Sequence, residues 1–192
     1  MATDTRDRIL DATADLFRER GYSGTGLKAI STAANAPFGS VYHHFPGGKD
    51  ELAAASLRRA ADGYAAHVLE VLAAGPTDVV EAIRHGFVAA GQTLVDTDFV
   101  DACPIATVAL EVASSNDALR RVTAEIFAGW LDALDLLFLG AGLDASNARR
   151  LSTLFLAALE GGFLLSRAAR DPEPMLLLGE SVAVAVAAAL GR

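Results

Sequence analysis

Two very short helical segments near the N-terminus restrict the fold more than any other feature of this sequence. The first is expected over residues 26–34 and the second over residues 37–45, where Pro46-Gly47-Gly48 ends it. Asn35 stands at the sharp turn between them, and Asn is one of the few non-glycine residues that enter the left-handed region with little strain. A short helix, a turn of about four residues and a second short helix make a helix-turn-helix.

An amphipathic helix is expected before this pair, over residues 4–20, and Gly21 suits its C-terminal end. Thr25 is expected to cap the second helix, and Pro37 to open the third. The inward side chains would close on Leu16 and Phe17; they are Ile30, Ser31, Ala34, Ala36, Val41 and Phe45. The remaining face of the third helix then carries Pro37, Phe38, Gly39, Ser40, Tyr42, His43 and His44.

The rest of the chain shows the spacing of longer helices, and no segment has a convincing strand pattern. Helices are expected over residues 49–73, 77–94, 104–113, 117–139, 146–170 and 173–190. Ala and Leu supply most of the 52% hydrophobic residues, which favours helices over sheets. The sequence therefore predicts an all-α chain with a small head, residues 1–46, and a larger helical body, residues 47–192.

Net charge is −8, which at first argues against a nucleic acid partner. The charge is unevenly distributed, because residues 1–59 hold eight Lys/Arg and seven Asp/Glu, a net +1. Residues 60–192 hold eight Lys/Arg and seventeen Asp/Glu, a net −9. An acidic body is thus joined to a nearly neutral head, and that head can still present a basic face of its own.

Cysteine content and hydropathy point to the cytoplasm. Cys103 is the only cysteine, so an internal disulfide is excluded and a reducing compartment fits. The N-terminus has acidic residues spaced through it and lacks the apolar segment of a signal peptide. The most apolar run, residues 175–190, is broken by Gly179, Glu180 and Ser181 and falls short of a membrane span. No membrane partner is expected.

The adjacent His43 and His44 raise the question of metal or proton chemistry. On a helix they point about 100° apart, so they cannot both bind one ion. No Cys or carboxylate stands at the one-turn spacing of helical zinc sites, and His67 and His85 are isolated. Ser40 lacks a G-x-S-x-G context, and the chain has no glycine-rich phosphate loop. No metal, cofactor or enzymatic activity is expected.

Contact with a phosphate backbone is the remaining interpretation. A helix in the major groove reads bases with its first residues and touches phosphates with its flanks. The hydroxyls of Thr25 and Tyr42, the histidine N–H groups and Lys49 can all donate to phosphate oxygens. The alternative for Tyr42 and His44 is that they only pack the head onto the body.

A resemblance joins these observations. The stretch RILDATADLFRERGYSGTGLKAISTAANAPFGSVYHHFPGGKDEL resembles the N-terminal DNA-binding region of the TetR family of bacterial transcriptional regulators. YHHFPGGKDEL, with its extra glycine, is most similar to the LmrA/YxaF-type subgroup, and CPIATVALEVASSNDALRR agrees with it. This sequence departs from the family pattern at Ser31, at Asn35, at Ala36-Pro37 and at Phe38, which cannot hydrogen-bond a base but can press on a thymine methyl.

The resemblance implies roles for particular residues of the head. Phosphate contacts would come from Thr25, Tyr42, His43 and Lys49, with His44 as a further one. Base edges would be faced by Lys28, Phe38, Gly39 and Ser40, with Pro37 close by. Residues 1–46 would then be the DNA-binding domain, and residues 47–192 the effector-binding and dimerisation domain.

The resemblance also implies that the body binds a small molecule and pairs with a second copy. Small residues recur at contact spacing on the last two helices. The expected dimer interface is Ala157, Ala158, Gly161, Gly162, Val182 and Val186, and the alternative is an ordinary internal core. Val182, Val184, Val186 and Leu190 leave the last helix apolar almost all round, so it is expected to be buried.

Six residues of the middle helices are candidates for a ligand cavity, although plain core packing is the simpler interpretation of each: Phe87, Gln92, Cys103, Phe127, Trp130 and Phe163. No Arg or Lys cluster appears among them, so an apolar or aromatic effector is expected.

The combined expectation is a homodimeric repressor, released from a near-palindromic DNA operator by a small-molecule effector. Regulation of an efflux pump is implied by the subgroup resemblance, and activation in place of repression stays open. Two rival hypotheses are a small-molecule binding protein without operator binding and a helical enzyme that uses Cys103.

Overall fold

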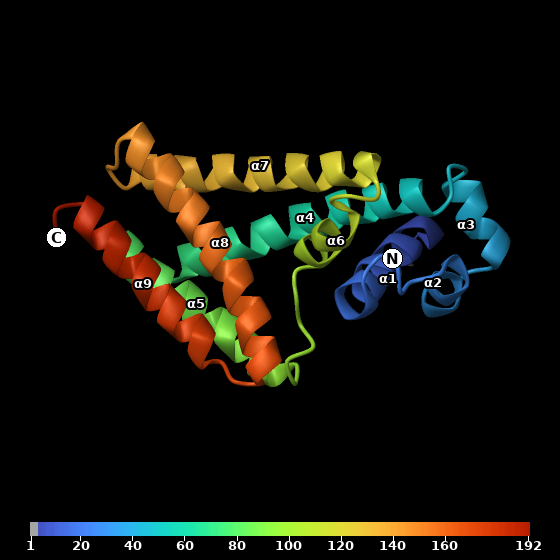
Figure 1. The fold of residues 1–192 in the computed structure, drawn as a ribbon, viewed down its shortest axis with the longest axis horizontal. Helices are drawn as coiled ribbons and strands as arrows, with labels where there is room; N and C mark the ends of the chain where they lie inside the picture. The colour runs from blue at the N-terminus through green and yellow to red at the C-terminus, as the bar shows by residue number, and fades with distance from the viewer. Residues whose placement is uncertain (1–3) are drawn as a thin grey trace. The chain divides into compact units, whose positions relative to one another are not determined.

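The computed structural model describes residues 4–192, with the side chains of residues 73 and 74 left out, and within that range the chain is all α-helical. Nine helices are described (Figure 1): α1 (Thr5–Arg20), α2 (Leu27–Ala33), α3 (Phe38–His44), α4 (Lys49–Ala74), α5 (Val79–Asp96), α6 (Pro104–Val112), α7 (Asp117–Gly140), α8 (Ala145–Ala169) and α9 (Glu173–Ala189). Each was expected, and the ends lie within two residues of the predicted ones.

Both ends of α5 lie two residues later than expected, and the shift of its start has a local cause. The Asp78 carboxylate accepts hydrogen bonds from the amides of Val80, at 3.0 Å, and Glu81, at 3.3 Å, so Asp78 caps the helix and α5 begins at Val79. Asp144 caps α8 in the same way, through the amides of Ser146 and Asn147.

The helices form two compact units. The first runs to Tyr64 and includes Ala102–Ile126, so it holds α1 to α3, the larger part of α4, the whole of α6 and the start of α7. The second comprises Ala65–Asp101 and Phe127–Arg192. The helix α6 packs on α1 within the first unit, and α4 contributes to both units. The boundary expected after residue 46, between a DNA-binding and an effector-binding domain, stays a prediction.

The core of the first unit lies between α1, α2, α3 and the start of α4. All six residues expected to face inward are buried, as are Leu16 and Phe17. Asn35 has a φ of 46°, which confirms the left-handed turn. Ser31, one of the positions at which the sequence departs from the family pattern, donates a buried hydrogen bond of 2.8 Å to the Ala36 carbonyl across this turn.

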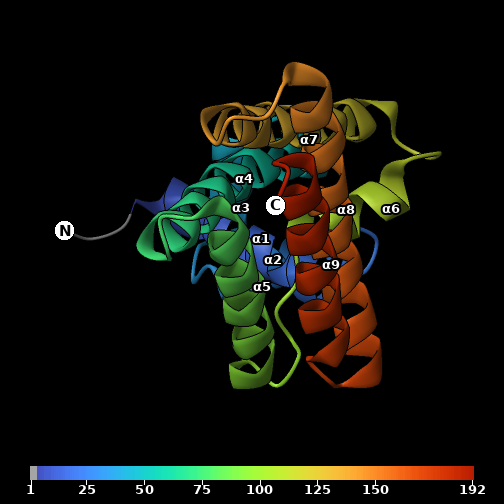
Figure 2. The ribbon, with the colours of Figure 1, turned by 90° about the vertical axis from the view of Figure 1, so that its left-hand side faces the viewer.

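The core of the second unit is built around α9, which packs against α5 and α8 (Figures 1 and 2). Phe87 of α5 meets Phe155 of α8 edge to face, with ring centroids 5.3 Å apart. Gly179 of α9 lies directly against Phe87, because a Cβ at that position would stand 2.4 Å from the Phe87 Cβ. Gly162 of α8 meets the Met175 side chain in the same manner.

One face of α9 is open in the single chain, so burial of the helix all round, as expected from the sequence, would need a second copy and stays a prediction. Val182 and Val186 are fully buried, whereas Val184 is 55% and Leu177 62% exposed. Neighbouring α8 likewise exposes Leu154, Leu164 and Leu165. The α8–α9 pair therefore presents apolar side chains to solvent in the single chain.

Among the described helices, α8 alone is long and apolar enough to cross a membrane, judged by length and composition only. Its most apolar stretch has a mean hydropathy of 1.3. Inside the chain 44% of that window is buried, where α8 packs against α9 and α5.

Candidate nucleic-acid interface

The outward surface of α3 is formed by aromatic and small side chains. Phe38 and Tyr42 are 48% and 49% exposed, and their rings meet edge to face at 5.6 Å because they lie one turn apart. Pro37 is the N-cap residue and not the first residue of the helix, which corrects the predicted start by one position. At Gly39 an added Cβ would meet nothing within 4 Å, so the surface beside the two rings is open.

The two histidines lie at the end of α3, next to the buried Phe45. Their rings are 5.0 Å apart and inclined by 70°. His43 is exposed, whereas His44 is half-buried with its ring 6.4 Å from that of Phe45. His43 is thus accessible to a partner, whereas His44 is partly in contact with the core and partly exposed to solvent.

Thr25 does not do what the sequence predicted. Thr25 is only 1% exposed. Its hydroxyl donates to the carbonyls of Gly21, at 2.7 Å, and Leu16, at 3.3 Å. Gly26 is the N-cap residue of α2, so the capping prediction is wrong. The hydroxyl instead ties the loop between α1 and α2 to the end of α1, and it is turned away from solvent.

Lys49 is also engaged inside the unit. Its ammonium donates to the Tyr22 carbonyl at 2.7 Å and lies 4.0 Å from the centre of the Tyr22 ring. Burial lowers the pKa of Lys49 despite the opposing charges of Glu111 and Asp50. By contrast Lys28, on α2, is exposed. Of the two lysines that were predicted to contact DNA, Lys28 is the one that is exposed.

Glu111 of α6 is a residue that the sequence did not single out. Its carboxylate accepts hydrogen bonds from two successive amides of the loop between α1 and α2, Tyr22 at 2.9 Å and Ser23 at 2.8 Å. Burial opposes the charged form, but the Ser23 and Tyr22 hydrogen bonds and the Lys49 charge lower the pKa of Glu111 below its ordinary value. Nothing near it in sequence points to this contact, because 89 residues separate Glu111 from Tyr22.

The side chain of Tyr22 completes this cross-link. Its hydroxyl donates to one oxygen of Asp50 at the start of α4, and the Asn116 amide donates to the other at 3.0 Å. Burial and the Asp50 carboxylate raise the pKa of Tyr22 to about 12. We call Tyr22, Lys49, Asp50, Glu111 and Asn116 the loop clamp, since together they hold the loop that precedes the helix-turn-helix.

The turn between α2 and α3 has its own support from α1. The Arg8 guanidinium donates to the carbonyls of Ala34, at 3.2 Å, and Asn35, at 3.5 Å. Arg6 lies over the Phe45 ring at 5.4 Å. Neither contact was expected from the sequence, and both fix α3 relative to α1.

The expected ligand residues are not gathered at one place. Phe87 and Phe163 are buried in the second unit, and Gln92 is exposed and donates to Asp96 at 2.8 Å. Phe127 and Trp130 form an edge-to-face pair with centroids 5.7 Å apart. Cys103 belongs to the first unit, where its buried sulfur accepts from the Ala106 amide at the start of α6.

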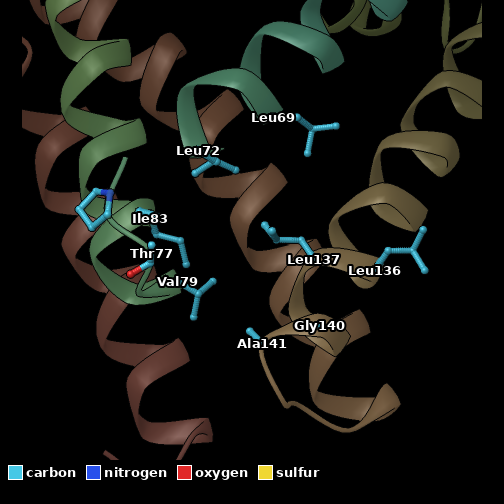
Figure 3. Close-up of a pocket in the computed structure, with 11 residues that line it drawn as sticks. Leu69, Leu72, Thr77, Val79, Ile83, Leu136, Leu137, Gly140 and Ala141 are labelled. Carbon is cyan, nitrogen blue, oxygen red and sulfur yellow. The ribbon is translucent and has the colours of Figure 1, made fainter. Parts of the chain in front are cut away.

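The second unit contains a cavity of about 610 Å³ that none of those six residues lines. It opens between the end of α4, the start of α5 and the end of α7 (Figure 3). Its lining consists of Leu69, Leu72, Pro76, Thr77, Val79, Ala82, Ile83, Leu136, Leu137, Gly140 and Ala141.

The six residues expected at a dimer interface divide into two groups. Ala158, Gly162, Val182 and Val186 are buried within the single chain, where they make the packing between α8, α9 and α5. Ala157 is exposed and Gly161 half-exposed. The small-residue pattern thus corresponds for the most part to contacts inside the chain.

Comparison with known proteins assigns the family. Residues 9–56 match the family described as bacterial regulatory proteins, tetR family, and residues 79–181 match the C-terminal domain of LmrA/YxaF-like transcriptional regulators. The chain belongs to the TetR family, whose members are transcriptional regulators with a helix-turn-helix and not enzymes.

Individual relatives agree over nearly the whole chain. The chain is 32% identical over 183 residues to YxaF of Bacillus subtilis (strain 168), an uncharacterized HTH-type transcriptional regulator, with 95% of each protein covered. It is 31% identical to the HTH-type transcriptional regulator LmrA of the same organism, over 93% of this chain and 95% of LmrA. A TetR transcriptional regulator from Legionella pneumophila has the same fold, with a TM-score of 0.80, 24% identity and coverage of 95% and 97%.

Proposed function

We propose that the protein is a homodimeric repressor, which binds a near-palindromic operator through α3 and releases it when a small, largely apolar effector binds the body. The observation that carries operator binding is the exposed surface of α3, with two aromatic rings beside an open Gly39. A helix with this surface, held by a core on its other side, is what major-groove recognition requires.

The roles of the residues follow from their exposure. Phe38, Gly39 and Ser40, with Pro37 close by, face base edges, and the Phe38 ring presses on a thymine methyl. Tyr42, His43 and His44 donate to phosphates, and Lys28 reaches a guanine or a phosphate. Thr25 and Lys49 support DNA binding indirectly, because both hold the loop between α1 and α2.

Dimerisation is supported by the open face of α8 and α9. Leu164, Leu165, Leu177 and Val184 are each more than half exposed in the single chain, with Ala157 and Gly161 on α8. Apolar side chains left exposed on two helices that pack together are candidates for an interaction site. Pairing the two helices with those of a second copy gives a symmetric interface and two α3 helices for successive major grooves.

Release is a shift of populations. The effector binds more tightly to dimers in which the two α3 helices no longer match the groove spacing, and operator DNA disfavours effector binding by the same factor. The chain acts in the cytoplasm, where the operator and a reduced Cys103 are found together.

The test is fluorescence anisotropy of the purified protein on DNA from upstream of its own and adjacent genes, against scrambled DNA, over a salt series. Binding is expected to one fragment, to weaken as salt rises, and to fall at least tenfold for Ser40→Arg, because a long charged side chain blocks the approach of α3. Tyr42→Phe removes one phosphate donor and is expected to weaken binding about fivefold on every sequence, near 1 kcal/mol.

Two outcomes would contradict the proposal. Equal weak binding to all fragments, or none, would favour a small-molecule binding protein that does not bind an operator. A changed sequence preference in Tyr42→Phe at unchanged overall affinity would remove Tyr42 from the phosphate contacts.

A further inference from the structure

We propose that Arg6, in the first turn of α1, binds a DNA phosphate beside the C-terminal end of α3. This inference rests on the proposed function for DNA as the ligand, whereas the choice of Arg6 rests on the contacts of the first unit. The sequence did not single out this arginine, which lies outside the helix-turn-helix formed by α2 and α3.

The first unit uses most of its cations in internal contacts. Residues 1–59 hold eight Lys/Arg. Two of them donate to backbone carbonyls, Arg8 at the turn between α2 and α3 and Lys49 at the loop before α2. Two more, Arg6 and Lys28, are exposed. The other four form ion pairs with carboxylates; they are Arg18, Arg20, Arg58 and Arg59.

The charge of Arg6 is not neutralised by a neighbouring carboxylate. Within residues 4–192, no Asp or Glu side chain forms an ion pair with it. Asp4 comes two positions earlier, but residues two apart do not face each other on a helix. Asp7 comes next in the sequence, and its carboxylate is paired with Arg59 at 2.9 Å. The positive charge of Arg6 is therefore available to an anion from outside the chain.

The Phe45 ring holds Arg6 at the C-terminal end of α3. Phe45 is the C-cap residue of this helix, and the Arg6 guanidinium lies 5.4 Å from the centre of its ring. The half-buried His44 ring stands 6.4 Å from the same Phe45 ring. Arg6 is thus placed at the flank of the surface that α3 presents. A helix in the major groove touches phosphates with its flanks, so the DNA backbone is expected here.

A cation at this position helps a phosphate to bind next to the end of α3. The C-terminus of a helix carries partial negative charge, which disfavours an anion unless a positive group stands beside it. A guanidinium that lies over an aromatic ring keeps its charge, and the N–H donors at its edge can bind two phosphate oxygens. Because the ring already restrains the Arg6 side chain, less conformational entropy is lost when a phosphate binds.

The salt dependence of DNA binding distinguishes a phosphate contact from a packing role. On B-DNA the logarithm of the binding constant falls with the logarithm of the salt concentration, by a slope of about 0.9 for each phosphate neutralised. If Arg6 binds one phosphate from each head of a dimer, its loss lowers the slope by about 1.8. An arginine that only covered Phe45 would act through the position of α3 and leave the slope unchanged.

The experiment measures this slope by fluorescence anisotropy of the full-length protein on two labelled duplexes, between about 50 and 200 mM salt. One duplex is the upstream fragment and the other has a scrambled sequence, since phosphate contacts carry no sequence information. Arg6→Met keeps a hydrocarbon chain over Phe45 and removes the charge. It is expected to lower the slope by about 1.8 on both duplexes and to weaken binding about tenfold at the lowest salt. Arg6→Lys keeps the charge and is expected to retain the wild-type slope.

The matched control is Arg58→Met, which removes the same charge from the same unit. Because Arg58 is paired with Glu125 at 3.2 Å, this variant is expected to have the wild-type slope. Equal slopes for Arg6→Met and Arg58→Met would overturn the phosphate contact, at any change in affinity. Circular dichroism checks that each variant folds, and Arg6→Gln decides if Arg6→Met does not.

Failure of the inference is separable from failure of the proposed function. An unchanged slope in Arg6→Met, in a protein that prefers the upstream fragment, would overturn the role of Arg6 and leave the repressor proposal standing. A lowered slope in a protein that binds both duplexes equally would support the phosphate contact and end the operator proposal. A wild-type protein that binds neither duplex at the lowest salt would overturn both.

Discussion

The two units of the chain hold their helices together by different means. In the first unit polar side chains bridge helices and loops. The Ser56 hydroxyl donates to the Leu10 carbonyl at 2.7 Å, Ser31 donates to Ala36, and the loop clamp joins the loop after α1 to α4 and α6. In the second unit helices meet through glycines, with Gly179 against Phe87 and Gly162 against Met175.

Helix length explains the difference. α2 and α3 have seven residues each, so neither offers a long apolar stripe, and much of their backbone lies in turns whose polar groups need partners. α8 and α9 have 25 and 17 residues and can pack over several turns. The first unit is therefore expected to be sensitive to lost hydrogen bonds, and the second to added volume.

The largest effect is expected from adding volume to the second unit. Gly179→Ala would place a methyl 2.4 Å from the Phe87 Cβ and 2.7 Å from its Cγ, so one helix must move. We expect a loss of about 3 kcal/mol in the free energy of unfolding, the upper part of the range for overpacked cores. Urea denaturation at one fixed protein concentration measures it, because a dimer's stability depends on concentration.

The control is Gly129→Ala in α7, where an added Cβ meets nothing within 4 Å. That substitution is expected to raise stability by about 0.5–1 kcal/mol, as alanine does in a helix interior. If the two substitutions had the same effect, close packing at Gly179 would not be what holds α9 to α5.

The fold was predictable because its signals are local. Gly21, Asn35 and the Pro46-Gly47-Gly48 break mark helix ends by their own backbone preferences, and all helices were found where periodicity placed them. The inward face of the helix-turn-helix followed from spacing alone, and each of those residues is buried. Whether a segment is helical, and which of its side chains point inward, can be determined from a short stretch of sequence.

The site was less predictable because its contacts are long-range. Thr25 has the residue type of a helix cap, but its hydroxyl finds the carbonyls of α1 instead. Small residues at contact spacing describe helix packing without saying whether the partner helix is in the same chain, and Ala158 and Gly162 face inward. The cavity is lined by α4, α5 and α7, which no single window contains.

A smaller effect is expected from opening the loop clamp. Glu111→Gln replaces one of the two accepting oxygens by an NH₂ group, which cannot accept from the Tyr22 or Ser23 amide. We expect a loss of about 2 kcal/mol in the free energy of unfolding, since one amide loses its partner. Chemical denaturation of the variant beside the wild type measures the difference, and a loss below about 0.5 kcal/mol would mean that water replaces the carboxylate.

The same pair of proteins gives a pH test. The pKa of Glu111 is lowered in the folded chain, so its stabilising contribution is present above the ordinary value of 4.5 and is lost as the pH falls through the folded value. The difference between wild type and Glu111→Gln should be constant at neutral pH and shrink as the pH falls below about 4. A difference that grows on acidification would contradict the charged carboxylate as the acceptor.

The smallest effect is expected from an ion pair at the surface of the first unit. Arg58 of α4 lies 3.2 Å from Glu125 of α7, and their side chains are 54% and 65% exposed. Because water already solvates both charges, Arg58→Ala should cost less than about 1 kcal/mol, and less again in high salt. Denaturation of this variant beside Glu111→Gln separates the two kinds of polar contact. An equal cost for both would show that charge on the surface, and not the satisfaction of loop amides, is what holds the first unit together.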